Sequence, residues 1–332
     1  MNNIELVGVV GGGVIQGHVL FEQIISKKNL FGAWREFSKG KKNKKDVRQF
    51  AFDLEENLID LYTDLRAGSY VHGGYTDFIV CDPKRRHIHK ASVRDRIVHH
   101  AIHRVLYPIW DRAFIFESFS SRLGKGTHAA IAHFERLAWG QSANNTKTVW
   151  VLKCDVRKFF DSVDQSILLE VFSGKFDDEK LLFLLKTVIR SFHKNPGKGL
   201  PLGNLTSQLL ANVYLDGMDH FIKRVLGVKG YVRYADDLLF ISRDKSKMEK
   251  ITRVVEDFLK NKLILDLHPG KTILRKWMSG IDVLGYTSFP HHRLLRAKTE
   301  RRMLARINPL NWASYASLLK HCRGHGIAKL LP

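Results

Sequence analysis

The spacing of apolar residues divides the chain into helical and extended segments. Apolar residues recur every three or four positions from Val47 to Leu65, which predicts one amphipathic helix. Further helices are predicted over 95–109, 164–193 and 248–259. Mostly apolar runs predict strands at 75–81, 149–154 and 263–267. The last forty residues carry spaced apolar side chains and predict a small helical segment. This mixture of helices and strands is typical of an α+β fold.

Two adjacent acids interrupt a segment that otherwise favours β structure. Tyr234-Ala235-Asp236-Asp237 lies between the β-forming runs 231–233 and 238–242, so we expect a tight hairpin with the acids at its turn. Neighbouring carboxylates repel each other unless a cation joins them. A hard divalent cation with oxygen ligands suits this position, and Mg²⁺ is the usual one.

A third acid ends another strand-like run. The apolar segment 149–154 leads directly into Asp155. Two strands that each end in an acid can hold two metal ions roughly 4 Å apart, which is the geometry of in-line phosphoryl transfer. Asp155, Asp236 and Asp237 are therefore the candidate catalytic residues.

The composition narrows the partners and the compartment. The chain has 332 residues, 44% of them hydrophobic, which indicates a globular protein. Its formal net charge of +21 indicates a polyanionic partner. The three cysteines, Cys81, Cys154 and Cys322, form no closely spaced pair, so we expect a reducing, cytoplasmic compartment. No apolar run approaches the length of a membrane span, so no membrane partner is expected.

Several motifs in a fixed order resemble the reverse transcriptase family over about residues 75–295. Asp155 matches the first catalytic aspartate of the family, and Tyr234–Asp237 matches its Tyr-x-Asp-Asp motif. The other matching segments are the fingers motifs at 82–86, 94–98 and 121–128, the nucleotide-pocket loop at 199–208 and the primer grip at 283–286. The resemblance implies a right-hand polymerase with fingers, a palm that contains an antiparallel sheet, and a small helical thumb. The implied boundaries are an N-terminal extension at 1–25, fingers with the start of the palm at 26–145, palm at 146–288 and thumb at 289–332.

The resemblance also implies an activity, RNA-directed DNA synthesis by nucleotidyl transfer, and its metal ligands. Two Mg²⁺ ions, or Mn²⁺ in their place, would be held by Asp155, Asp236, Asp237 and the carbonyl of Val156. One ion would activate the primer 3′ hydroxyl and the other would hold the triphosphate. The implied substrates are a template RNA, a primer that becomes cDNA, and dNTPs.

Further residues are assigned to the nucleotide by their place in these motifs. Phe160 occupies the position of the steric gate, whose ring leaves no room for a 2′ hydroxyl. Lys84 and Arg86 would grip the triphosphate, and Lys271 would protonate pyrophosphate. Leu202, Gly203 and Gln208 lie in the pocket loop, and we expect Asn204 to cap the helix that follows.

Other basic and loop residues are expected to contact the nucleic acid. They are Arg94, Arg96, Arg122, Lys125 and Lys158, with Leu284 and Gly285 from the primer grip. For Arg94 and Arg96 a structural alternative stays open, in which they pair with Asp95 or with other acids.

Leu202 and Gln208 narrow the resemblance to the reverse transcriptases of diversity-generating retroelements. Those enzymes copy a template RNA with frequent errors at adenines, and the copy diversifies a target gene by mutagenic retrohoming. The resemblance implies a small basic accessory protein and a bacterial, archaeal or phage-encoded origin. The alternatives are a retron, defence or group II intron-type reverse transcriptase and, among non-enzymes, an RNA-binding protein with a decayed palm.

Overall fold

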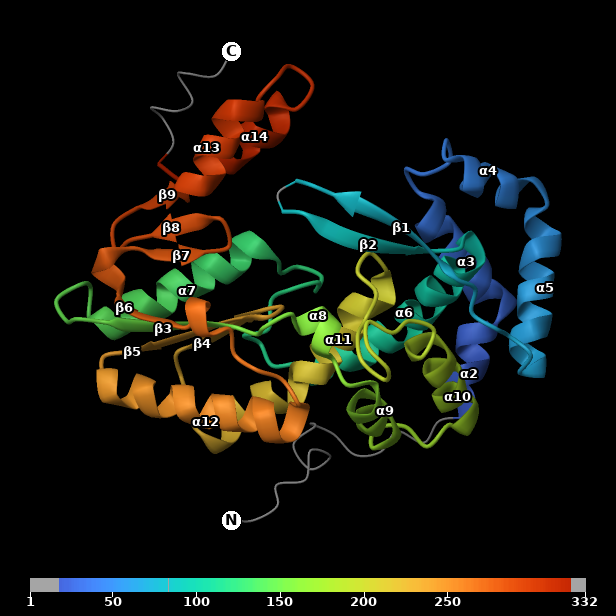
Figure 1. The fold of residues 1–332 in the computed structure, drawn as a ribbon, viewed down its shortest axis with the longest axis horizontal. Coiled ribbons are helices and arrows are strands. Elements are labelled where there is room, and N and C mark those ends of the chain that lie inside the picture. The colour runs from blue at the N-terminus through green and yellow to red at the C-terminus, as the bar shows by residue number, and fades with distance from the viewer. Residues whose placement is uncertain (1–17, 83, 324–332) are drawn as a thin grey trace. The chain divides into compact units, whose positions relative to one another are not determined.

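The computed structural model describes residues 18–82 and 84–323, and Figure 1 draws its helices and strands. The chain forms two compact units. Unit 1 consists of Met1–Ile115, Arg157–Val225 and Phe258–Leu265, and unit 2 of Phe116–Val156, Leu226–Asp257 and Asp266–Pro332. Most of the predicted N-terminal extension lies outside the described residues. In the part of the chain that is described, no helix is both long and apolar enough to cross a bilayer.

Unit 1 is mainly helical. Its helices are α2 (His18–Ile25), α3 (Lys27–Ser38), α4 (Lys45–Phe52), α5 (Leu54–Ala67), α6 (Val93–Ala113), α8 (Phe159–Ser162), α9 (Gln165–Ser173), α10 (Glu179–Ile189) and α11 (Leu205–His220). The long helix α6 packs against α2, α3 and α11. Its Ile97, Ile102, Leu106 and Trp110 are buried because they lie on the face that these helices cover.

One hairpin extends unit 1. β1 (Tyr75–Val80) pairs antiparallel with β2 (Arg86–Ala91), with Tyr75 opposite Ala91 and Val80 opposite Arg86. The strand predicted at 75–81 and the helix predicted at 95–109 are thereby confirmed. Five of the six residues of β1 are exposed, so contacts at the root and along β2 must hold the hairpin in place.

Unit 2 contains the sheet that carries the candidate catalytic acids. The strand order is β4-β5-β3-β6, with β4 (Tyr231–Tyr234), β5 (Asp237–Ser242), β3 (Trp150–Asp155) and β6 (Ile273–Lys276). These pairs are antiparallel. Helix α7 (Thr127–Ser142) packs on β4 and β5 and buries Ile131, Phe134 and Ala138. The predicted α+β class is confirmed by these helices and antiparallel strands.

A second sheet and two short helices complete unit 2. β7 (Ile281–Val283), β8 (Tyr286–Ser288) and β9 (Arg293–Leu295) pair antiparallel, and α13 (Ala297–Arg306) and α14 (Trp312–Leu319) follow. Trp277, Val283 and Tyr286 share one buried apolar cluster with Phe134 of α7 and Met303 of α13. The helical segment predicted near the C-terminus is present, whereas β6 and the sheet β7-β8-β9 were not predicted.

Three predicted elements need correction. The single helix predicted from Val47 to Leu65 is two helices that meet at Asp53, a residue type that favours helix ends. The helix predicted over 164–193 is α9 and α10, with Gly174 ending the first and Asp178 capping the second. The strand predicted at 263–267 is wrong, because α12 (Lys245–Leu263) extends to its start and Ile264 has a left-handed φ of 51°.

Candidate active site

The sheet of unit 2 brings two of the predicted acids directly opposite each other. Asp155 is the last residue of β3 and Asp237 is the first of β5, and the two are paired in the antiparallel register. Residues opposite each other in such a pair have Cβ atoms about 5 Å apart, and like charges there destabilise the sheet. The strand ends therefore concentrate negative charge at one point.

The third acid lies in the hairpin turn. Tyr234 pairs with Asp237, which leaves Ala235 and Asp236 as a two-residue loop, and Ala235 has a φ of 53°. The backbone nitrogen of Val156 donates to the Asp236 carbonyl at 3.2 Å, so the end of β3 is joined to the turn. The predicted tight hairpin with acids at its turn is confirmed.

A buried arginine shapes this turn, and the sequence pattern did not indicate it. Arg233 has no exposed surface. Its guanidinium donates to the Ala235 carbonyl at 3.2 Å and to Ser118 Oγ at 2.9 Å. Phe119 and Arg233 are also joined, through a backbone bond of 3.0 Å. Arg233 thus links the left-handed residue of the turn, Ala235, to Ser118, which lies 115 positions before Arg233.

Two lysines approach the acids. Lys271 Nζ lies 2.8 Å from Asp155 Oδ1, and Lys153 Nζ lies 3.4 Å from Asp237 Oδ1. Lys153 also donates to the Asp282 carbonyl at 3.0 Å, which links the sheet to β7. Lys271 was predicted from its motif. Lys153 was missed, although its place two residues before Asp155 puts it on the same face of β3.

Asp236 has a raised proton affinity. Burial, followed by the charges of Asp237 and Asp155, raises the pKa of Asp236 from 3.8 to about 6, while Lys271 opposes this change. The largest cause is burial, which disfavours the charged carboxylate. The turn thus holds an acid whose ionised form needs a compensating positive charge.

The chemistry of these side chains fits a divalent cation, but their present directions do not form a complete ligand set. Among the described residues, no three His, Cys, Asp or Glu side chains are arranged to hold one metal ion. Asp155 is turned to Lys271 and Asp237 to Lys153. The three groups are all carboxylates, the ligands that Mg²⁺ prefers. After burial, the charges of Asp237 and Asp155 raise the pKa of Asp236, and a cation would neutralise these charges.

The pocket loop belongs to unit 1. Gly199 and Leu200 donate to the carbonyls of Val163 and Phe160 at 2.8 and 2.7 Å. Gly203 has a φ of 108°, which side-chain-bearing residues rarely adopt. Leu202 and Phe160 are half-buried, and Gln208 is exposed in the first turn of α11.

The predicted capping role of Asn204 is wrong. Asn204 is the N-cap residue of α11, but its side chain accepts no hydrogen bond from the helix. The side-chain amide donates instead to the His89 carbonyl at 2.9 Å. The Asn204 side chain thus bonds a distant residue in β2 and not the backbone of its own helix.

The other predicted contact residues are dispersed over both units. Lys84 and Arg86 are exposed at the end of the hairpin, next to Pro83, which lies outside the described residues. Arg94 pairs with Asp64, and Arg96 lies 2.7 Å from Asp46 Oδ2, so both engage acids other than Asp95.

In unit 2, Arg122 donates to the Ser118 carbonyl at 3.0 Å, and Lys125 lies over the Phe116 ring at 4.4 Å. Leu284 and Gly285 form the turn between β7 and β8, with φ values of 49° and 94°. Lys158 in unit 1 is exposed. The structure thus gathers Asp155, Val156, Asp236, Asp237 and Lys271 in unit 2, while Lys84, Arg86, Phe160, Leu202, Gly203 and Gln208 belong to unit 1.

Comparison with known proteins identifies the family. The reverse transcriptase (RNA-dependent DNA polymerase) family matches residues 81–288, which include every acid of the candidate site. Protein YkfC of Escherichia coli (strain K12) is 26% identical over 69% of this chain and 68% of its own length. Group II intron-encoded protein LtrA of Lactococcus lactis subsp. cremoris is 21% identical over 70% of this chain and 49% of its own.

A third relative is the nuclear intron maturase 4, mitochondrial, of Arabidopsis thaliana, which is 28% identical over 40% of this chain and 17% of its own length. The chain therefore spans about two thirds of YkfC and half or less of these intron proteins. None of the three names points to a diversity-generating retroelement. The chain belongs to the reverse transcriptase (RNA-dependent DNA polymerase) family, and the predicted enzyme class, RNA-directed DNA polymerase, is confirmed at the level of that family.

Proposed function

We propose that this chain extends a primer along a template RNA with dNTPs, and that Asp155, Asp236 and Asp237 carry the reaction. The observation behind the proposal is the meeting of three acids at the ends of β3 and β5 in a chain of this family. A polymerase also needs a way to grip the polyanionic template, and the net charge of +21 supports that requirement. The right-hand arrangement with its four segments is part of the same proposal.

The proposed roles of the residues follow from where they lie. Asp155, Asp236 and Asp237, with the carbonyl of Val156, would hold two Mg²⁺ or Mn²⁺ ions, which when bound supply Lewis acidity to the attacking 3′ hydroxyl and the leaving pyrophosphate. Lys271 Nζ, now 2.8 Å from Asp155, is the proposed proton donor to pyrophosphate. Lys153 neutralises Asp237 and orients it from the same sheet.

Unit 1 supplies the proposed dNTP contacts. Phe160 is the proposed steric gate, and Leu202, Gly203 and Gln208 shape the pocket. Lys84 and Arg86 are free to reach a triphosphate because both are exposed. Arg94, Arg96, Arg122, Lys125 and Lys158, with Leu284 and Gly285, are proposed to contact the template and the primer. Arg94 and Arg96 would do so while keeping their acid partners.

A primer-extension assay tests this proposal. Purified chain, a primed RNA template, dNTPs and Mg²⁺ should give full-length cDNA, and EDTA should stop synthesis. A parallel reaction on a DNA template of the same sequence measures template preference. Absence of incorporation on the RNA template across Mg²⁺ and Mn²⁺ concentrations would reject the proposed activity.

The finer proposal is error-prone copying in a diversity-generating retroelement, worst at template adenines. It rests on Leu202 and Gln208, since an apolar Leu202 cannot offer the hydrogen bond by which a polar side chain would help reject a wrong pair. One such bond is worth roughly 1–3 kcal/mol of discrimination. A small basic accessory protein and a cytoplasmic location belong to the same proposal.

The competing subgroup is an intron-type reverse transcriptase, which the similarity to LtrA favours. Retron and defence enzymes remain alternatives within the same family. Sequencing of cDNA from the wild type and from Leu202→Gln on one template separates these possibilities. The retroelement proposal expects many adenine errors in the wild type and about tenfold fewer in the variant. An accurate wild type would reject the retroelement and leave the polymerase proposal intact.

A further inference from the structure

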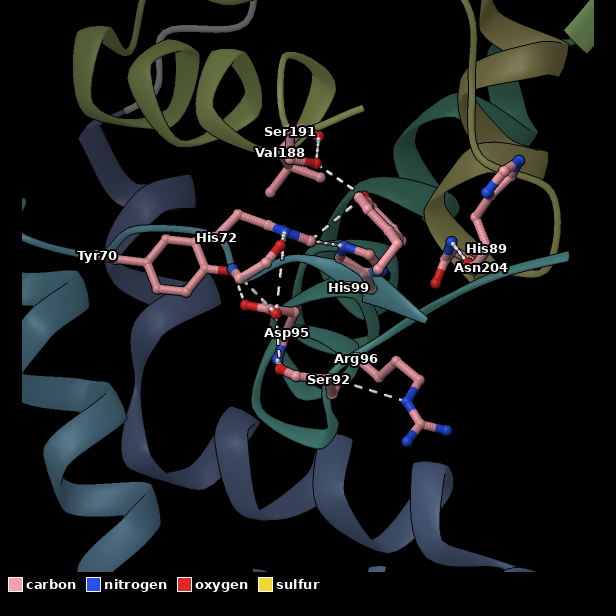
Figure 2. Close-up of polar contacts among 12 residues, drawn as sticks. Tyr70, His72, His89, Ser92, Asp95, Arg96, His99, Val188, Ser191 and Asn204 are labelled. Atoms are coloured by element: carbon pink, nitrogen blue, oxygen red, sulfur yellow. Dashed lines mark hydrogen bonds and ion pairs between the residues drawn. The ribbon is translucent and has the colours of Figure 1, made fainter. Parts of the chain in front are cut away.

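The middle of β2 is bonded on its outer edge to the pocket loop. His89 lies opposite Asp77 of β1. Its backbone nitrogen donates to the Leu202 carbonyl at 2.9 Å, and its own carbonyl accepts from Asn204 Nδ2, also at 2.9 Å. Both main-chain groups of His89 are thus used by the loop, which completes the strand edge that β1 leaves free. Figure 2 shows the Asn204–His89 contact.

The loop approaches β2 so closely that only glycine fits between the two bonds. A Cβ atom on Gly203 would lie 2.6 Å from Ile88 Cγ2. Gly203 also has the φ of 108° that side chains rarely tolerate. The two hydrogen bonds to His89, from the residues before and after Gly203, therefore hold the loop directly against β2.

Asn204 is buried for this contact and not for helix capping. Its exposed fraction is 3%. Its Oδ1 atom has no hydrogen-bond partner among the described residues, although a buried polar atom in this state costs free energy. Because α11 starts at the next residue, the amide of Asn204 joins the beginning of this helix to the strand.

The root of the hairpin is held separately, through Asp95 of α6 (Figure 2). Asp95 is buried, and its carboxylate accepts hydrogen bonds from Tyr70 Oη at 2.7 Å, Ser92 Oγ at 2.6 Å and the Gly73 nitrogen at 3.1 Å. A carboxylate with three donors is strongly fixed. The segment that leads into β1 is thus tied to the start of α6.

Two histidines continue this anchor. Burial lowers the pKa of His99 to about 3, so its ring is neutral at pH 7. His72 Nδ1 lies 2.6 Å from the Gly73 carbonyl, and His72 Nε2 lies 3.1 Å from His99 Nε2. Tyr75, the first residue of β1, bonds Ser191 at 2.7 Å. The hairpin root is therefore fixed both to α6 and to Ser191, which follows α10.

We propose that Asn204 is a positioning residue that sets the dNTP pocket by clipping the pocket loop to β2. β2 begins at Arg86, a proposed triphosphate contact, and the clipped loop carries Leu202, a proposed contact of the nascent pair. Because the hairpin root is fixed, the bond from the Asn204 amide sets the distance between Arg86 on β2 and Leu202 in the loop. This inference rests on the proposed polymerase function.

Asn204→Asp is the variant that isolates the clip. It keeps the size of the side chain and a good N-cap residue, so the helix start is preserved, but a carboxylate cannot donate to the His89 carbonyl. Asn204→Ser is the second variant. Serine also suits the N-cap position, but its side chain is too short to reach the His89 carbonyl. Asn57→Asp is the matched control, because Asn57 Nδ2 makes the same kind of bond to the Phe50 carbonyl at 3.1 Å, within α4 and α5.

Two measurements are needed. Hydrogen exchange of the peptide that contains His89 should quicken about tenfold in Asn204→Asp and Asn204→Ser, and stay unchanged in Asn57→Asp. In primer extension, the KM for dNTPs should rise about tenfold in the Asn204 variants, with kcat changed less than twofold and RNA affinity unchanged.

Each other result has a definite meaning. Unchanged exchange at His89 overturns the clip, whatever the activity. Faster exchange with an unchanged KM overturns the positioning role. An equal rise of KM in Asn57→Asp would mean that general destabilisation is the cause, which also overturns it. A wild type that incorporates no dNTP rejects the proposed function, while the exchange measurement still decides the clip.

Discussion

At the scale of single residues, two lysines partly offset the repulsion between the three acids at the strand ends. Asp155 and Asp237 face each other, Asp236 lies in the turn, and Lys271 and Lys153 each approach one acid. Without a cation, the lysines offset part of the repulsion. Burial and, after it, the charges of Asp237 and Asp155 still raise the pKa of Asp236 to about 6, so the lysines do not fully compensate the ionised acid.

Stability without metal should therefore fall as pH rises. A pKa of about 6 in the folded protein, against the ordinary 3.8, means that the folded state keeps a proton that the unfolded state releases between these values. Stability declines as pH rises through this window, and the penalty is complete above about pH 6. In EDTA, Asp236→Asn should melt roughly 1–2 °C above the wild type at pH 7.5, as a gain of about 1 kcal/mol would give in a chain of 332 residues, and equal it near pH 3.

Mg²⁺ provides the control for this melting experiment. At pH 7.5 it should raise the Tm of the wild type more than that of Asp236→Asn, because the variant lacks one carboxylate. Equal Tm values of the two proteins across the whole pH range in EDTA would contradict the crowded-charge interpretation.

Phe160 allows a test of sugar selection. It is half-buried, and its ring packs edge-on against Phe159 at 5.7 Å, so the backbone should keep its place when the ring is removed. Phe160→Ala should admit ribonucleotides, with discrimination between dATP and ATP falling about tenfold or more while dATP incorporation falls less. Unchanged discrimination would remove Phe160 from the gate role.

At the scale of elements, the sequence pattern predicted structure that depends on neighbouring residues, but not contacts between distant segments. The hairpin of β4 and β5 was predictable because β-forming runs flank a short turn. Arg233 and Lys153 were not, because their partners Ser118 and Asp282 lie 115 and 129 positions away. The run 263–267 favours β structure by composition, but it forms no strand because α12 ends at Leu263 and Ile264 adopts a left-handed φ of 51°.

An ion pair that no periodicity revealed joins the sheet β7-β8-β9 to α7. Arg293 Nε donates to Glu135 Oε1 of α7 at 3.0 Å, and Ser288 Oγ donates to the same oxygen at 2.9 Å. The side chains of Arg293 and Glu135 are 15% and 22% exposed, so water cannot fully replace the bonds. This pair ties the sheet that contains the Leu284–Gly285 turn to α7.

Glu135→Gln should destabilise unit 2 by about 1.5–3 kcal/mol, the range for hydrogen bonds to charged groups. The matched control is Glu249→Gln, whose partner Lys245 lies 3.5 Å away in a pair that is more than half exposed. The control should lose no more than about 0.5 kcal/mol. Urea unfolding of both variants measures the difference. Equal losses would show that the Glu135 pair contributes no more than a surface pair.

At the scale of the whole molecule, charge decides how the chain meets its substrate. The excess of 54 basic over 33 acidic residues gives the net charge of +21. Several of the basic groups near the proposed template contacts, such as Arg94 and Arg96, already pair with acids. Binding to RNA should thus depend on the remaining unpaired charge and on the release of counterions from phosphates.

RNA affinity should fall steeply with salt. If 6–10 phosphates are contacted, the affinity drops about 10³–10⁵-fold between 50 and 200 mM salt. Fluorescence titration of a labelled RNA hairpin at several KCl concentrations gives the slope. A flat titration would contradict a phosphate-dominated interface, and Asp236→Asn should follow the wild-type slope because it alters the reaction and not the basic surface.

The most direct measurement compares primer extension by the wild type and by Asp236→Asn at saturating RNA. The variant removes one carboxylate from the turn and leaves the fold and the basic surface in place. The expected result is loss of cDNA synthesis by at least about a thousandfold, roughly 4 kcal/mol of transition-state stabilisation, with RNA affinity within twofold of the wild type. Near-normal synthesis by Asp236→Asn would contradict the assignment of the reaction to these strand-end acids.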